Sequence, residues 1–323
     1  MNTKTRLLSY LKEEKGTWIS GESLSRRIGI TRSAVWKSIS RLREEGYGIE
    51  SSPNKGYRFL RVSEMLLPSE IGEGLDTKVL GKRDIIHYKE TGSTNARAKE
   101  LASRGAPEGT LVVSEAQSQG RGRKGRIWFS PPQTGIYASL ILRPAMPPNE
   151  APKITLLTAV SAAETLLHLT ILDVRIKWPN DILVNGKKIA GILTEISTEM
   201  DTIDYVVVGL GMNVNNTFLP DDINETATSI LIETGERFPR VEIVREYLRR
   251  QETYYRVLTT SGFEPILGRW KELANIIGRQ IKVEMIDKTY VGTVEDIDPE
   301  GVLILKDMKG ASHRIFSGDV TLV

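Results

Sequence analysis

The chain has 323 residues, of which 40% are hydrophobic and 26% charged, so it is long enough for two or three globular domains. It contains no cysteine and only three histidines, which excludes disulfides, thiolate metal sites and cysteine nucleophiles and disfavours a histidine metal cluster. No resident metal is therefore expected. No run approaches the roughly 18 apolar residues of a membrane span, and no apolar signal core follows the first residues, so we expect a cytoplasmic protein.

The net charge of +3 is unevenly distributed along the chain. Residues 1–62 hold 13 Lys and Arg against 6 Asp and Glu, whereas the remainder holds 31 against 35. A basic segment on a slightly acidic body is typical of proteins whose basic part meets nucleic acid.

The basic segment has the pattern of a winged helix-turn-helix domain, which we assign to residues 1–65. Apolar spacing and stop signals predict three helices, over residues 3–15 and 20–28 and from Thr31 onward. Two short strands then flank the turn at residues 53–56 and form a two-stranded wing.

The third helix of this domain is expected to enter a major groove of DNA. The residues on or near its exposed side are those that would meet base edges and phosphates: Thr31, Arg32, Ser33, Trp36 and Lys37. A winged helix used only for protein contacts is the alternative, and the basic charge favours DNA.

Residues 66–83 lose the apolar period and are interpreted as a linker or docking helix. A strand is predicted at residues 85–88, followed by the turn at residues 91–95, whose Ser or Thr caps a helix that ends near residue 103. This helix start is either a plain cap or an anion site.

A strand at residues 110–116 leads through Gln117 into residues 120–126, Gly-Arg-Gly-Arg-Lys-Gly-Arg, which precede Trp128. Glycines allow close backbone approach and arginines offer planar donor forks, so this segment can wrap an anion. It also spells the G-x-G-x-x-G dinucleotide fingerprint, but no helix can open at the Ser-Pro-Pro that follows. A mobile basic surface loop is the alternative interpretation.

A further strand is predicted at residues 135–142, and then a helix over residues 153–169. The apolar positions of this helix that are expected to face the core are Ile154, Leu157, Val160 and Leu167.

Residues 174–193 contain the strongest hairpin signal in the chain, because Asn185-Gly186 separates two apolar runs. Pro179 cannot donate to a ladder, so the first strand should bend or bulge there and present Asn180 and Asp181 irregularly. Lys188, just past the turn, is either a solvated lysine or a functional one.

The run at residues 205–211 is apolar enough for a buried strand, and it ends in Gly209-Leu210-Gly211-Met212-Asn213. Its small residues permit approach either of a ligand or of a neighbouring strand. Helices are predicted at residues 241–258 and 262–273, and four or five short strands from residue 281 make a small β-barrel.

Taken together, the chain closely resembles, over nearly its whole length, the bifunctional biotin-protein ligases that double as biotin operon repressors. Residues 120–126 with Trp128, residues 177–181 (Lys-Trp-Pro-Asn-Asp) and residues 188–193 (Lys-Ile-Ala-Gly-Ile-Leu), in this order behind a winged helix, carry the resemblance. The chain departs from the family at Lys124, where another arginine is common.

The resemblance implies an α+β multidomain fold. Its parts are the winged helix-turn-helix domain, the linker, a central mixed α/β ligase domain of the class II synthetase type at residues 84–275, and an SH3-like β-barrel at residues 276–323.

It also implies a two-step reaction in which biotin and ATP form biotinyl-5'-AMP and pyrophosphate, and a lysine of a biotin carboxyl carrier protein then displaces AMP. ATP and Mg²⁺ are cosubstrates, and no bound cofactor is expected. Lys188 and Arg123 are the implied catalytic residues. The implied ligand-binding residues are Ser93, Thr94, Asn95, Gln117, Arg121, Gly122, Arg123, Trp128, Lys188, Gly191 and Asn213. We hypothesise that Asp181 helps deprotonate or orient the acceptor lysine, and a purely structural carboxylate is the alternative.

The family further implies that the adenylate promotes a homodimer, which spans a two-fold operator. Two rival interpretations remain at this point: a ligand-sensing transcription factor that has lost catalysis, and a lipoate-type ligase.

Overall fold

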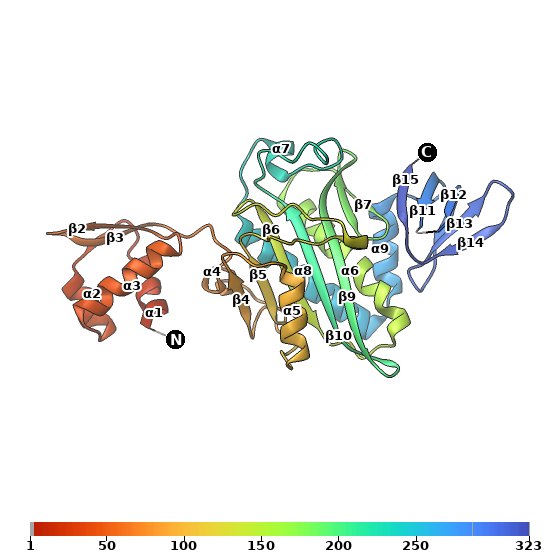
Figure 1. Cartoon of the computed structure of the whole chain (residues 1–323). Helices are drawn as coiled ribbons and strands as arrows, with labels where there is room; N and C mark the ends of the chain where they lie inside the picture. The colour runs from red at the N-terminus through yellow and green to blue at the C-terminus, as the bar shows by residue number, and fades with distance from the viewer. Residues whose placement is uncertain (1–2, 286, 323) are drawn as a thin grey trace. The chain divides into compact units, whose positions relative to one another are not determined.

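The structure is a computed structural model, and it describes residues 3–285 and 287–322. The chain forms two compact units, one that extends to Glu73 and one that begins at Gly74 (Figure 1). Within the described residues, no helix combines the length and the apolarity needed to cross a bilayer.

The first unit contains the three predicted helices, α1 (Thr3–Glu13), α2 (Gly21–Ile28) and α3 (Arg32–Glu44). The Thr31 side chain accepts a hydrogen bond from the Ala34 amide and so begins α3, while Gly29 ends α2 in the left-handed conformation. A continuous core of buried leucine, isoleucine and valine side chains joins the three helices.

The wing has three strands rather than the predicted two. In addition to β2 (Gly48–Ser52) and β3 (Gly56–Arg61), the strand β1 (Trp18–Ile19) pairs antiparallel with β3. A two-residue strand has no period of its own, so the sequence pattern could not reveal this pairing.

The short helix α4 (Pro68–Gly72) lies in the segment interpreted as a linker and belongs to the first unit. Its Glu70 is 4% exposed and accepts hydrogen bonds from Lys12 at 2.7 Å and from the Tyr47 hydroxyl at 2.6 Å. The preceding Leu67 packs in the core of the same unit, which ties α4 to the helix-turn-helix.

The second unit is built on a seven-stranded sheet with the order β4-β5-β6-β10-β9-β8-β7. The strands are β4 (Ile85–Tyr88), β5 (Leu111–Ser114), β6 (Gly135–Leu142), β7 (Val174–Lys177), β8 (Asp181–Val184), β9 (Lys187–Glu199) and β10 (Thr202–Asn213). The β4–β5 pair is parallel and the other pairs are antiparallel, so the sheet is mixed.

Helices cover both faces of this sheet, with α5 (Thr94–Ser103) on one face and α6 (Ala151–Leu169) and α8 (Arg240–Ser261) on the other (Figure 1). Every residue of β6 is buried as a result. The prediction that Leu167 faces the core is wrong, because Leu167 is 36% exposed and Leu166 is buried in its place. The helix also begins two residues earlier than predicted, at Ala151.

The segment around Pro179 is a tight hairpin and not one bent strand. β7 and β8 run antiparallel, with Lys177 opposite Asp181, and the chain reverses through Trp178 and a cis Pro179. The second predicted hairpin is confirmed: Asn185 and Gly186 have φ values of 51° and 76°, the pattern of a type I′ turn between β8 and β9.

Two short helices and a sheet complete the unit: α7 (Ile230–Thr234), α9 (Glu264–Ala274) and a five-stranded antiparallel sheet. The strands of that sheet are β11 (Gln280–Glu284), β12 (Thr289–Ile297), β13 (Leu303–Asp307), β14 (Ser312–Ile315) and β15 (Asp319–Leu322). Their order is β14-β13-β12-β11-β15, which agrees with the predicted run of short strands.

Candidate functional site

A cavity of about 510 Å³ opens in the second unit, over the ends of β8, β9 and β10 and the start of α5. Its wall contains every residue that the sequence predicted for the ligand site: Ser93, Thr94, Asn95, Gln117, Arg121, Gly122, Arg123, Trp128, Asp181, Lys188, Gly191 and Asn213. Segments separated by more than a hundred residues in the sequence therefore meet at one site.

The start of α5 forms one end of the cavity through a network of polar side chains. Ser93 caps the helix by accepting from the Ala96 amide, as the plain-cap alternative requires. Thr94 does more, since its amide and its hydroxyl donate to Gln117 Oε1 at 2.8 and 3.1 Å and its hydroxyl accepts from Ser139 at 2.8 Å. These contacts fix the Gln117 amide at the cavity wall.

The glycines at the end of β10 leave room for two side chains of the cavity wall. A Cβ at Gly209 would lie 2.1 Å from Asn95 Oδ1, and one at Gly211 would lie 2.5 Å from the Trp128 ring. Close packing thus explains why both positions are glycine. The side chains that pack against them, Asn95 and Trp128, belong to the cavity wall. Asn95 is held in place by bonds to Ser139 at 2.6 Å and to the Leu193 carbonyl at 3.1 Å.

The glycine-arginine loop, residues 120–126, makes a tight turn and contributes to the cavity wall. Its Gly122 amide donates to the Arg126 carbonyl at 2.7 Å, and a short 3-10 turn follows at Arg123–Gly125. Lys124 has a φ of 55°, a left-handed conformation that is unusual for a lysine. Asp319 of β15 holds the loop through ion pairs with Lys124 at 3.2 Å and Arg126 at 2.7 Å.

Arg123 extends from this loop to the β7–β8 hairpin. Its guanidinium donates to Asn180 Oδ1 at 2.9 Å, and burial lowers the pKa of Arg123. Asn180 in turn donates to the Ile192 carbonyl at 2.8 Å, so the turn that contains Pro179 is anchored to β9.

Lys188 belongs to the cavity wall and is the second residue of strand β9. Its ammonium is 2.7 Å from Asp181 and 5.3 Å from the centre of the Trp128 ring. Gly191 makes room for it, because a Cβ there would lie 2.9 Å from the Lys188 side chain. The indole N–H of Trp128 is buried and has no hydrogen-bond partner among the described residues.

Four residues of the segment 223–228 also line the cavity, namely Ile223, Glu225, Thr226 and Ala227, and no sequence pattern predicted them. The Lys188 amide donates to the Thr226 carbonyl at 2.8 Å, and the Thr228 amide donates to the Lys188 carbonyl at 2.9 Å. Asn213 donates to the Thr228 carbonyl at 2.9 Å. Residues 223–228 therefore form a strap beside Lys188, which only the fold reveals because the segment has no apolar period.

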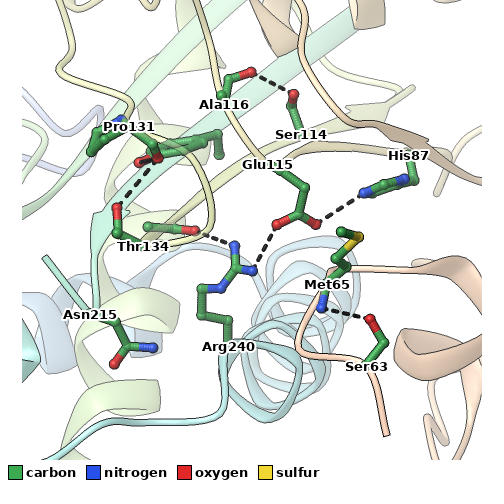
Figure 2. Close-up of polar contacts among 12 residues, drawn as sticks. Ser63, Met65, His87, Ser114, Glu115, Ala116, Pro131, Thr134, Asn215 and Arg240 are labelled. Atoms are coloured by element: carbon green, nitrogen blue, oxygen red, sulfur yellow. Dashed lines mark hydrogen bonds and ion pairs between the residues drawn. The ribbon is translucent and has the colours of Figure 1, made fainter. Parts of the chain in front are cut away.

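A second polar cluster is made by residues that do not line the cavity, and Figure 2 shows its Glu115 between His87 and Arg240. The distances from its carboxylate are 3.0 Å to His87 and 2.7 Å to Arg240, and both members of the Glu115–Arg240 pair are almost completely buried. Arg240 also donates to the Gly135 carbonyl at 3.0 Å. Glu115 directly follows β5 and lies two residues before Gln117, so this cluster fixes the start of the segment that carries the loop.

The predicted DNA-contacting residues belong to the first unit, whereas the residues that line the cavity belong to the second. Thr31, Arg32, Ser33 and Lys37 are all exposed, and Trp36 is 59% exposed, a large fraction for a tryptophan. They lie in the N-terminal half of α3 or cap it. In helix-turn-helix proteins, the N-terminal residues of the recognition helix are the ones that reach base edges.

Comparison with known families gives three matches in chain order. The HTH domain family matches residues 3–58, the Biotin/lipoate A/B protein ligase family matches residues 88–213, and the Biotin protein ligase C terminal domain matches residues 276–323.

Similar whole proteins and solved structures carry related names. A protein of Bacillus subtilis (strain 168) named bifunctional ligase/repressor BirA is 41% identical, over 98% of this chain and 97% of its own length. Its namesake in Escherichia coli (strain K12) is 30% identical over 95% of this chain and 94% of its own length. The structure of the biotin protein ligase from Aquifex aeolicus in complex with biotin and ATP matches with a TM-score of 0.64 at 28% identity, covering 75% of this chain and 99% of that one.

Proposed function

The chain belongs to the family of bifunctional biotin ligase/repressors, and from that membership we propose that it biotinylates a carrier protein and represses biotin genes. In the first reaction, the biotin carboxylate attacks the α-phosphate of ATP to give biotinyl-5'-AMP and pyrophosphate. In the second, a lysine of a biotin carboxyl carrier protein displaces AMP. Binding of biotin and ATP by the similar Aquifex aeolicus ligase supports this choice of substrates.

The observation that carries the proposal is the meeting of the three motifs in one cavity around Lys188. Each nucleophile comes from a substrate, so the protein needs only to position the reactants and to stabilise charge. Lys188 would offset negative charge that develops near the carboxylate and the α-phosphate, since its ammonium faces the cavity from a rigid strand.

The two ends of the cavity suit the two halves of the adenylate. The amide and hydroxyl groups at Thr94, Asn95 and Gln117 would face biotin, because neutral hydrogen-bonding groups suit its uncharged ring. Arg121 and Arg123 would close over the phosphate, and the Trp128 ring would offer a face to the adenine.

Asp181 would serve the second reaction. A carboxylate can hold an incoming lysine and accept its proton, and Asp181 is partly exposed at the cavity wall. To accept that proton, the Asp181 carboxylate must either contact both lysines at once or break its ion pair with Lys188. Mg²⁺ would enter as a cosubstrate on ATP, which offsets part of the triphosphate charge.

Repression would follow when carrier is fully biotinylated and the adenylate complex accumulates. The bound adenylate would order the glycine-arginine loop and promote a homodimer, whose two α3 helices would contact a two-fold operator. We retain the assignment of residues 1–65 to DNA binding, 66–83 to the linker, 84–275 to catalysis and 276–323 to the terminal barrel. Because its substrates and operator are intracellular, we place the protein in the cytoplasm.

Turnover with biotin, ATP, Mg²⁺ and an apo-carrier domain tests the ligase activity directly. The expected products are AMP, pyrophosphate and biotinyl-lysine in equal amounts. A protein that binds biotin but forms no AMP would instead be a ligand sensor without catalysis. Preference for lipoate over biotin in the same assay would identify a lipoate ligase.

Sedimentation and operator binding test the repressor activity. Biotinyl-5'-AMP should raise the sedimenting mass toward that of a dimer and strengthen operator binding. Hydrogen exchange should be fast in residues 120–126 without ligand and slower with adenylate. A mass and an operator affinity that do not respond to adenylate would contradict this coupling.

A further inference from the structure

The cavity wall carries more positive charge than its own acidic groups balance. Among the residues that line it, the cations are Arg121, Arg123, Arg126, Lys177 and Lys188, and the acidic residues are Asp181, Glu225 and Asp319. Five cations against three carboxylates leave a surplus of two positive charges, which suits an anionic ligand.

Most of these cations already have partners. Lys188 pairs with Asp181, Arg126 with Asp319, and Arg123 donates to Asn180. In the described part of the chain, the side chains of Arg121 and Lys177 make no hydrogen bond or ion pair. Arg121 lies on the glycine-arginine loop, whereas Lys177 is the last residue of strand β7.

The position of Lys177 is fixed by the hairpin to which it belongs. It lies opposite Asp181 in the β7–β8 ladder, and Asp181 contacts the Lys188 ammonium at 2.7 Å. The next residue, Trp178, is 2% exposed, so the backbone at Lys177 is packed in place. A partly buried cation without a partner on a rigid strand is prepared for an anion that arrives from outside.

We propose that Lys177 binds the β- and γ-phosphates of ATP and stabilises the pyrophosphate that leaves. This inference rests on the proposed function and adds a residue to its first reaction. An oxygen of the biotin carboxylate forms a bond to the α-phosphorus, and the bond from that phosphorus to the bridging oxygen breaks with its electron pair on pyrophosphate. The leaving group gains one negative charge, and a fixed ammonium beside it favours that step.

The two half-reactions separate this role from a structural one. Biotinyl-5'-AMP has no β- or γ-phosphate. A substitution of Lys177 should therefore impair adenylate formation and leave the transfer of biotin to the carrier unaffected. For Lys177→Gln we expect kcat/KM for ATP, measured by pyrophosphate release, to fall roughly ten- to hundredfold, the scale of one lost hydrogen bond to a charged group. Transfer from preformed biotinyl-5'-AMP to an apo-carrier domain should change less than about twofold.

Three further variants complete the test. Lys177→Arg keeps the positive charge and should recover most of kcat/KM. Lys177→Met keeps an unbranched side chain of similar length without the charge, and it replaces Lys177→Gln if the glutamine variant is unstable. Lys187→Gln is the matched control, because Lys187 lies in the neighbouring hairpin but outside the cavity wall, and it should behave as wild type. Equal losses in both half-reactions, or an unchanged dependence on ATP, would overturn the proposal.

Calorimetric titration with inorganic pyrophosphate gives a readout that does not depend on turnover. The wild-type protein should bind pyrophosphate, and Lys177→Gln should bind it roughly tenfold or more weakly. If the wild-type protein forms no adenylate, the proposed function fails while this titration still decides the role of Lys177. Equal pyrophosphate affinity in both proteins would refute that role.

Discussion

The ammonium of Lys188 and the carboxylate of Asp181 lie 2.7 Å apart on the adjacent strands β9 and β8, at the wall of the cavity. The two side chains are 32% and 22% exposed, so water screens the pair only in part. Because both strands belong to the central sheet, the positions of the cation and the carboxylate are set by backbone pairing and not by a loop.

Removal of the Lys188 ammonium should impair adenylate formation. For Lys188→Ala we expect a loss of roughly 10²-fold or more, the usual scale for removal of one charge-stabilising donor. Biotin-dependent pyrophosphate release measures it, and Lys187→Ala serves as the control for loss of a nearby lysine. Near-normal release by Lys188→Ala would show that Lys188 is not the catalytic lysine.

Substitution of Asp181 distinguishes a catalytic carboxylate from a structural one. If Asp181 accepts the proton of the acceptor lysine, Asp181→Asn should slow transfer from preformed adenylate by roughly 10²-fold, within the range of general base catalysis. The pH dependence of the remaining rate should change as well. Unchanged transfer would exclude the base role and leave Asp181 as the partner that holds Lys188.

A methyl group at Gly211 should displace Trp128. The added Cβ would lie 2.5 Å from the indole, so Gly211→Ala should cost about 1–3 kcal/mol of stability through overpacking and should weaken binding of the adenylate. Thermal unfolding and calorimetric titration measure the two effects. Gly268→Ala is the control, because a Cβ on helix α9 meets nothing within 4 Å and alanine favours a helix. Equal behaviour of the two variants would contradict the steric argument.

Loss of one member of the buried Glu115–Arg240 pair should destabilise the second unit. Arg240→Met leaves a carboxylate that is 3% exposed without this partner, which costs about 3–5 kcal/mol in comparable buried pairs. Urea unfolding measures the change in free energy. The exposed pair Arg26–Glu22 offers the control, since Arg26→Met should cost less than about 1 kcal/mol. A small effect of Arg240→Met would show that water or neighbouring groups replace the lost contact.

The exposed cations at the start of α3 should contribute to DNA affinity and leave the ligase reaction unchanged. Arg32→Ala and Lys37→Ala should each weaken operator binding. Each should also reduce the slope of log affinity against log salt by about one if the lost contact is to a phosphate. Fluorescence anisotropy at several salt concentrations measures both quantities. Lys15→Ala, in the turn after α1, is expected to change neither quantity. An unaltered affinity of all three variants would refute DNA contact by α3.

The sequence by itself determined which chemical groups this protein has and the order in which they occur. The Asn185-Gly186 dipeptide specified a hairpin because both residues tolerate positive φ, and the structure has that turn. The three motifs specified the family, and the basic first segment specified a nucleic-acid-binding unit, because local spacing and charge do not depend on how distant segments pack.

Only the tertiary structure decided which of these groups meet. The spacing of apolar residues assigned Leu167 to the core, yet Leu167 is exposed, because it lies in the last turn of α6, after the buried part of the helix ends at Leu166. The break at Pro179 became a hairpin that places Lys177 beside Asp181, and Gly209 and Gly211 proved to make room for Asn95 and Trp128. The contacts of Gly209 with Asn95 and of Gly211 with Trp128 join residues distant in sequence, and a local pattern carries no information about the distance between such residues.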